Sequence, residues 1–206
     1  MGGVNIIDAA RLLHLCTTIA RAFFMKNILS PKMRLVLPLL LLAAISCQKL
    51  VGLLNFKISD STNFTIPATG PLVNTALALP GIPVSSNSSS TYAGNNTTAD
   101  YVQDVTLDQL TLTTTDPSTQ TFDFLKSISI YIATDAAGSN KVLLASLSPV
   151  PTGQTSISLT PSGNKLDLYL RTGNYTLFTT AELAKALPQD TKVRADSQFN
   201  VKANVK

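Results

Sequence analysis

The feature that most constrains the fold is a strict alternation of residue types near the end of the printed sequence. From Val193 to Val205 the odd positions are apolar or small, whereas the even positions from Lys192 to Lys206 carry Lys, Arg, Asp, Gln or Asn. Successive side chains of a β-strand point to opposite faces, so a period of two puts one face in a core and the other in water. The segment therefore predicts a long strand of an antiparallel sheet.

The same alternation predicts further strands elsewhere. It returns over 128–132, and within 105–112 the parity of the apolar residues changes, which indicates a bulge near Asp108 and Gln109. Additional strands are predicted over 50–58, 62–66, 141–147, 154–160 and 174–180. Helical spacing of apolar residues is scarce and predicts only short helical turns, over 121–126, 164–171 and 180–187.

Turn-forming sequences separate these apolar segments at 115–118, 137–140, 151–153 and 161–164. Many short strands joined by turns are typical of sandwiches and partly open barrels. We therefore expect an all-β chain whose residues 50–206 form a single antiparallel β-sandwich, immunoglobulin-like or a similar Greek key, with a few short helical turns. A length of this order suits one hydrophobic core.

An apolar run over 35–45 is about half the roughly 20 residues that a membrane-spanning helix needs. Basic residues precede the run and small residues end it: Lys26, Lys32 and Arg34 before, Ala43, Ala44 and Ser46 at its end. This order is typical of a secretory signal peptide. We expect a signal-peptide helix at 25–46 that is removed from the mature protein.

The residues Ala44-Ile45-Ser46-Cys47 resemble a bacterial lipobox, which signal peptidase II recognises and cuts before the cysteine. The resemblance implies that Cys47 becomes the new N-terminus, with a diacylglyceryl group on its sulfur and an acyl chain on its amine. Two or three chains anchor a protein durably. The alternative is that Cys47 is an ordinary buried thiol behind a plain secretion signal.

Two further predictions concern the boundaries of this segment. Residues 1–24 precede Met25, the start of a leader of ordinary length, and we interpret them as an over-extended N-terminus. The alternative is an amphipathic segment, because several of its leucines stand near helical spacing. After cleavage before Cys47, residues 47–49 would be the lipidated cysteine and a very short tether. By resemblance to lipoprotein sorting rules, Gln48 favours the outer membrane.

Removal of the leader changes the charge of the chain. The formal charge of +4 arises before Cys47, where five basic residues and one acidic residue lie. From Cys47 onward, eleven basic residues meet eleven acidic ones. The mature chain also lacks a basic run interleaved with aromatic residues, so we expect no nucleic-acid partner.

The sequence also limits the chemistry of the mature chain. His14 and Cys16 both precede the expected cut, which leaves no histidine and no unmodified cysteine after it. A Ser-His-Asp triad, a Cys-His pair, a histidine-ligated zinc and an internal disulfide are therefore excluded there. Hydrolysis by two carboxylates stays open, but no particular pair is indicated. We predict no enzyme activity, no catalytic residues, no cofactor and no metal ligand.

Two local features have competing interpretations. Asp100, Asp104 and Asp108 recur every four residues and could form a calcium site, but they are better interpreted as the solvated face of a strand. The polar segment 85–98 predicts an exposed, solvated loop, because it has too few apolar groups to bury itself. A binding surface for glycans, with Tyr92 as its aromatic residue, is the alternative.

The body of the chain, with STNFTIP at 61–67 and TFDFLKSISIYI at 121–132, resembles small β-sandwich lipoproteins of diderm bacteria. We expect a lipid-anchored, non-enzymatic protein of the cell envelope, held to the membrane by the lipid on Cys47, with an envelope protein or a glycan as partner. The first alternative is a surface adhesin or fimbrial subunit that donates the strand at 191–205 to a neighbour. The second is a glycan-binding module that uses the 85–98 loop.

Overall fold

The computed structural model describes residues 53–70 and 76–204, all of which belong to the second of two compact units, Val51–Lys206. The expected signal peptide at 25–46, the lipobox Ala44–Cys47 and the tether 47–49 lie outside the described residues. Within the described ranges, no helix has both the length and the apolar character needed to cross a membrane.

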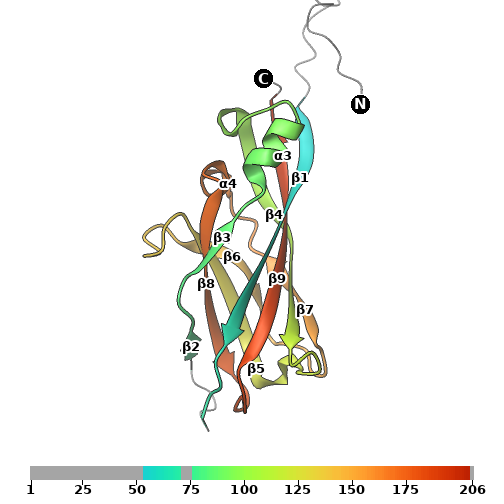
Figure 1. Ribbon diagram of the computed structural model, residues 1–206, viewed down its shortest axis with the longest axis vertical. Helices are drawn as coiled ribbons and strands as arrows, with labels where there is room; N and C mark the ends of the chain where they lie inside the picture. The colour runs from blue at the N-terminus through green and yellow to red at the C-terminus, as the bar shows by residue number, and fades with distance from the viewer. Residues whose placement is uncertain (1–52, 71–75, 205–206) are drawn as a thin grey trace, which may run out of the picture. The chain divides into compact units, whose positions relative to one another are not determined.

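The described chain is built mainly of strands (Figure 1). The strands are β1 (Leu54–Ile66), β2 (Ala76–Ala78), β3 (Ile82–Ser85), β4 (Val102–Asp116), β5 (Leu125–Ala133), β6 (Val142–Leu147), β7 (Ser156–Pro161), β8 (Asn174–Leu183) and β9 (Thr191–Ala203). The helical elements are short: α3 (Ser88–Gly94), η2 (Ala99–Tyr101), η3 (Phe122–Phe124) and α4 (Asp167–Arg171).

All neighbouring strands pair antiparallel, in the order β1-β9-β4-β7-β6-β5-β8-β2, and β3 also pairs with β8. Strand β7 joins two layers, because its first residues pair with β4 and its last two, Thr160 and Pro161, pair with β6. The sheet therefore curls over on itself into a sandwich. The predicted all-β, antiparallel sandwich with a few helical turns is confirmed.

The long alternating segment forms β9, which lies between β1 and β4. Its apolar face is buried as predicted, with Val193, Ala195, Phe199 and Val201 at most 1 % exposed. Strand β9 pairs with β1 along its whole length, from Leu54↔Ala203 to Ile66↔Thr191, without a shift in register. Both edges of β9 are thus occupied within its own domain.

The bulge predicted near Asp108 and Gln109 is confirmed. The register between β4 and β9 shifts between Leu107 and Gln109, so Asp108 has no partner residue on β9. The extra residue keeps Leu107 and Leu110 on the buried face in spite of their spacing. Strand β4 can therefore follow β9 over its full length while its apolar parity changes.

Two sequence-based assignments differ from the structure. The segments 50–58 and 62–66 are not separate strands, since β1 runs unbroken from Leu54 to Ile66. The helical turn predicted at 180–187 is wrong, because β8 continues to Leu183 and pairs with β5 there. Ala181 and Leu183 face the core on alternate positions, and this strand burial prevails over the weak helical spacing.

The prediction of a solvated loop at 85–98 is only partly confirmed, because most of the segment is exposed or half-buried but it is not an irregular loop. Residues Ser88–Gly94 form α3, and the Tyr92 side chain is only 2 % exposed. Its ring packs edge-on against Phe56, and its hydroxyl donates to the carbonyl of Leu170 at 3.2 Å. One large buried aromatic residue anchors a segment whose other residues are small or polar.

Candidate functional site

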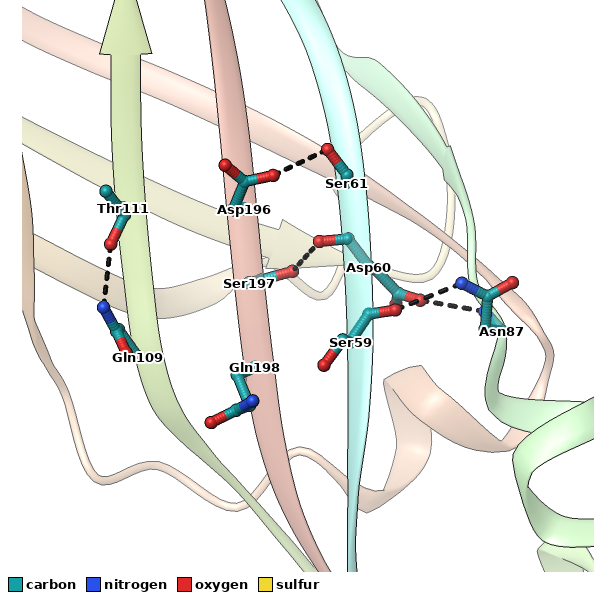
Figure 2. A pocket seen from close by; sticks show the side chains of 9 residues that line it. All are labelled: Ser59, Asp60, Ser61, Asn87, Gln109, Thr111, Asp196, Ser197 and Gln198. Atoms are coloured by element: carbon teal, nitrogen blue, oxygen red, sulfur yellow. Dashed lines mark hydrogen bonds between the residues drawn. The ribbon is translucent and has the colours of Figure 1, made fainter. Parts of the chain in front are cut away.

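The outer face of β1, β9 and β4 carries a hollow of about 310 Å³ with a polar lining (Figure 2). Strand parity explains this composition, because odd residues of β1 and even residues of β9 point outward. The register places Ser61 opposite Asp196 and Ser59 opposite Gln198. The residues that line the hollow are Ser59, Asp60, Ser61, Asn87, Gln109, Thr111, Asp196, Ser197 and Gln198.

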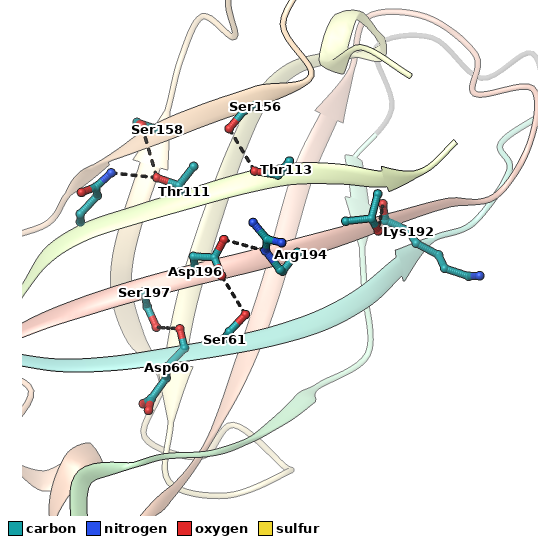
Figure 3. Close-up of polar contacts among 12 residues, drawn as sticks. Asp60, Ser61, Thr111, Thr113, Ser156, Ser158, Lys192, Arg194, Asp196 and Ser197 are labelled. Atoms are coloured by element: carbon teal, nitrogen blue, oxygen red, sulfur yellow. Dashed lines mark hydrogen bonds and ion pairs between the residues drawn. The ribbon is translucent and has the colours of Figure 1, made fainter. Parts of the chain in front are cut away.

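Hydrogen bonds within and between neighbouring strands hold the outward side chains of this face (Figure 3). Asp196 accepts from the Ser61 hydroxyl and from Nε of Arg194, each at 2.8 Å. The hydroxyls of Thr113 and Ser156 lie 3.0 Å apart on β4 and β7. The face therefore presents hydroxyls, amides and neutralised charges, which suit hydrogen bonding to a polar ligand.

The lysine on β1 reaches across β9 to the bulge on β4. Lys57 Nζ donates to Asp108 Oδ2 and to Gln198 Oε1, both at 2.8 Å, and Asn200 Nδ2 donates to Asp108 Oδ1 at 3.0 Å. The hydrogen bond from Lys57, followed by that from Asn200, lowers the pKa of Asp108 below its ordinary value. The bulged carboxylate thus ties three strands together on the outer face.

The three regularly spaced aspartates do not converge. Asp108 is held by Lys57, Asp104 lies 3.7 Å from Lys202 Nζ, and Asp100 belongs to η2. Among the described residues, no group of three or more His, Cys, Asp or Glu side chains is arranged to hold a metal ion. The pairing with lysines matches the interpretation of Asp104 and Asp108 as part of a strand's solvated face.

A second carboxylate at the hollow, Asp60, points to the other side of the sheet and is 4 % exposed. Its Oδ1 accepts from the backbone N–H of Asn87 at 2.8 Å, and its Oδ2 accepts from the Tyr175 hydroxyl at 3.1 Å. Burial, together with the nearby Asp60 charge, raises the pKa of Tyr175 above its ordinary value. Asp60 therefore links β1 to β8 in the opposite layer and to the residue before α3.

Asp60 and Asp196 do not form a facing pair. Asp60 lies on the inner face of the sheet and Asp196 on the outer face, on neighbouring strands. Both oxygens of each carboxylate already accept hydrogen bonds. Hydrolysis by two carboxylates requires both groups to flank one bond. The arrangement therefore does not support that chemistry.

The sequence-predicted site residues and the hollow overlap little. Ala44, Ile45, Ser46 and Cys47 lie outside the described residues, and the segment 85–98 contributes only Asn87 to the lining. Asp60 was not singled out from the sequence. Its position on the same parity as Ile58, Phe64 and Ile66 marks it as inward-facing, and this was the signal that could have found it.

No protein-family model matches the sequence, and no curated protein matches it. Three solved structures are similar at low level. The Cyanophage Pam1 capsid asymmetric unit has 15 % identity and a TM-score of 0.31, with 72 % of this chain and 86 % of that chain covered. The decameric BFDV capsid protein has 10 % identity and a TM-score of 0.36, with 74 % and 99 % covered. Desmodium yellow mottle tymovirus has 12 % identity and a TM-score of 0.23, with 74 % and 90 % covered. Scores this low carry no argument about this chain.

Proposed function

We propose that this chain is a lipid-anchored β-sandwich of the bacterial cell envelope, on the outer membrane, with a structural or interaction role. The observation that carries the proposal is the order of basic residues, apolar run, small residues and cysteine over 26–47. Cys47 stands seven residues before Leu54, where β1 begins. Seven extended residues reach roughly 25 Å, so the lipid would hold the sandwich close to the bilayer.

A non-enzymatic role is supported by the side chains that remain. The mature chain has no histidine and no free thiol, and the two carboxylates at the hollow face opposite sides of the sheet. Both oxygens of each of these carboxylates already accept hydrogen bonds, which does not favour acid-base turnover. A screen of the purified mature protein against glycan, peptide and ester substrates tests this, and robust turnover of any of them would refute it.

The anchor is tested by the intact mass of protein purified from membranes of a diderm host. We expect a chain that begins at Cys47 and carries a diacylglyceryl group and a further acyl chain. Cys47→Ser should abolish labelling by radioactive palmitate, whereas Cys16→Ser should leave the labelling unchanged, because only Cys47 follows the lipobox. An unacylated native product, or one that retains residues before Cys47, contradicts the proposal.

Glycan binding is the second candidate function, and the polar hollow is the observation that favours it. Amide and hydroxyl side chains from three strands converge there. The charged groups beside them have partners, because Lys57 donates to Asp108 and Gln198, and Asp196 accepts from Ser61 and Arg194. Retention of the full chain on immobilised neutral glucan or purified peptidoglycan sacculi tests the idea. The variant Gln109→Ala/Gln198→Ala should lose retention, while Thr113→Ala, outside the hollow on the same face, should keep it. Absence of retention in the intact protein rules out this candidate.

A further inference from the structure

Strand β1 forms one edge of the sandwich. Within the described ranges it pairs with β9 on one side and with no strand on the other. It runs for thirteen residues without a bulge against β9 and contains neither proline nor glycine. Long, regular edge strands are templates for further pairing, and natural proteins usually interrupt them with charge, proline or a bulge.

Two hydrogen bonds establish which backbone groups of β1 point to the open side. The carbonyl of Asp60 accepts from the Ser197 hydroxyl on β9, whereas the carbonyl of Ser59 accepts from the side-chain amide of Asn87, which lies on the other side. In an antiparallel strand the N–H and C=O of one residue point to the same side, and the side alternates along the chain. The N–H and C=O groups of Ser61, Asn63 and Thr65 therefore point away from β9.

The available part of this edge has clear limits. At one end, Asn87 already occupies the carbonyl of Ser59. At the other end, Pro67 has no backbone N–H to donate. Between them, 61–65 is uncharged, and the described part of the chain contributes no strand alongside it. Three residues thus offer their donors and acceptors over a segment that lacks the usual protection of an edge.

We propose that β1 pairs antiparallel with β1 of a second copy of this chain, about a two-fold axis at Asn63. Ser61 then lies opposite Thr65 of the partner subunit, and Asn63 lies opposite Asn63 of the partner subunit. This register uses all three outward residues and forms about six backbone hydrogen bonds. A register one step away in either direction would bring Ser59 or Pro67 into the pairing, where a group is occupied or absent.

A second copy fits this edge better than an unrelated peptide because the segment is complementary to itself. A two-fold axis puts identical residues opposite each other at the centre, so a charged central residue would repel its own copy. Asn63 is neutral, and its amide can both donate and accept across the axis. The axis also joins the two outer faces into one continuous polar surface. The proposal does not depend on the lipid anchor.

The test is the association state of the full chain, measured by sedimentation velocity over a wide concentration range in a density-matched detergent. The wild type should show a reversible monomer–dimer equilibrium. Asn63→Lys and Asn63→Asp, each alone, should weaken self-association by about fivefold or more, because like charges then face each other across the axis. An equimolar mixture of the two variants should regain association, since opposite charges then meet.

The matched control is Asn55→Lys, which adds the same charge on the same exposed face of β1 but outside 61–65, and which should associate like the wild type. A wild type that stays monomeric throughout the range overturns the proposal, as does a mixture that associates no better than its components. Wild-type dimers that Asn63→Lys leaves intact would overturn it too, since they must use another surface. Circular dichroism on every variant verifies that the sheet persists.

Discussion

Asp60 is a charged residue on the core side of a strand. Burial of a carboxylate costs free energy unless hydrogen bonds compensate for its lost hydration. Here the compensation comes from Asn87 and Tyr175, which belong to parts of the chain far from β1 in sequence. The residue therefore helps to place two other segments. Its removal should destabilise the fold mainly because the Asn87 N–H and the Tyr175 hydroxyl lose their acceptor.

This role predicts the effect of two substitutions. Asp60→Asn and Tyr175→Phe should each lower the free energy of unfolding by about 1–3 kcal/mol, because the first replaces the acceptor Oδ2 by an amide nitrogen that cannot accept from Tyr175, and the second leaves Oδ2 without that donor. The double variant should cost less than the sum of the two, because the second change removes a group already left alone. Urea denaturation of the mature protein measures this. Additive losses would show that the two side chains do not interact.

The surface carboxylate Asp196 is the matched control for this cycle. It also accepts two hydrogen bonds, from Ser61 and Arg194, but on the solvated face. Asp196→Asn should change the free energy of unfolding by no more than about 0.5 kcal/mol. A loss as large as that of Asp60→Asn would mean that burial does not govern the cost.

The buried tyrosines predict a loss of stability in alkali. Burial raises the pKa of Tyr92 to about 12, above an ordinary value of 10.0. A pKa raised by folding contributes stability that is complete below the unfolded pKa and is lost as the pH rises through the folded pKa. For Tyr92 this window runs from about pH 10 to about pH 12.

Tyr92→Phe should therefore reduce the steepness of the decline over this window, by up to about 1.4 kcal/mol per pH unit. Urea denaturation at a series of pH values measures the slope, and absorbance at 295 nm follows ionisation directly. If the free energy of unfolding falls equally steeply with pH in the variant, the decline arises from the ionisation of groups other than Tyr92.

At the scale of elements, the bulge in β4 has an electrostatic consequence. It projects Asp108 toward the ammonium group of Lys57, two strands away, and this contact lowers the pKa of the carboxyl group. Lys57→Met should raise the pKa of Asp108 toward its ordinary value, because the largest cause of the shift is removed. The carboxyl carbon chemical shift, followed by NMR against pH, reports this value.

The sign of the linked effect on stability follows. A pKa lowered by folding contributes stability above the unfolded pKa that disappears as the pH falls through the folded pKa. Lys57→Met should therefore make unfolding less sensitive to acid below about pH 4. Asn55→Met, on the same face of β1 but outside this network and outside 61–65, is the control. An unchanged pKa in Lys57→Met would exclude the lysine as the cause.

Elements with a long, clean periodicity were predictable from the sequence. The alternation over 193–205 identified β9, and the change of parity near Asp108 located the bulge. Errors arose where local signals were weak and distant contacts decided the outcome. Tyr92 anchors a polar segment through its own burial and a hydroxyl bond to Leu170, and pairing with β5 extends β8 into a segment of helical spacing. Neither partner is apparent from the local sequence.

The candidate site was less predictable than the fold, because it depends on which strands become neighbours. Ser61 and Asp196 meet across 135 residues of chain, and Lys57 and Asp108 across 51. The sequence indicated that these side chains would be solvated, since their parity was clear. It could not indicate that Ser61 and Asp196 would line one hollow, because strand order arises from the packing of the whole molecule.

At the scale of the whole molecule, the strand order couples the two ends of the described chain. β9 lies between β1 and β4, so its loss would separate two strands that have no other connection in that layer. A chain that ends after Gln189 should therefore fail to form the sandwich. We expect the far-UV circular dichroism of a disordered chain and rapid cleavage by trypsin. A protease-resistant core of native size would contradict this.

The position of β9 also has a temporal consequence. A ribosome makes Leu54 well over a hundred residues before Phe199, yet among the described strands β1 pairs only with β9. The sandwich therefore cannot complete its fold until β9 has been synthesised. Such a delay is compatible with translocation of the unfolded chain through a protein-conducting channel before it folds.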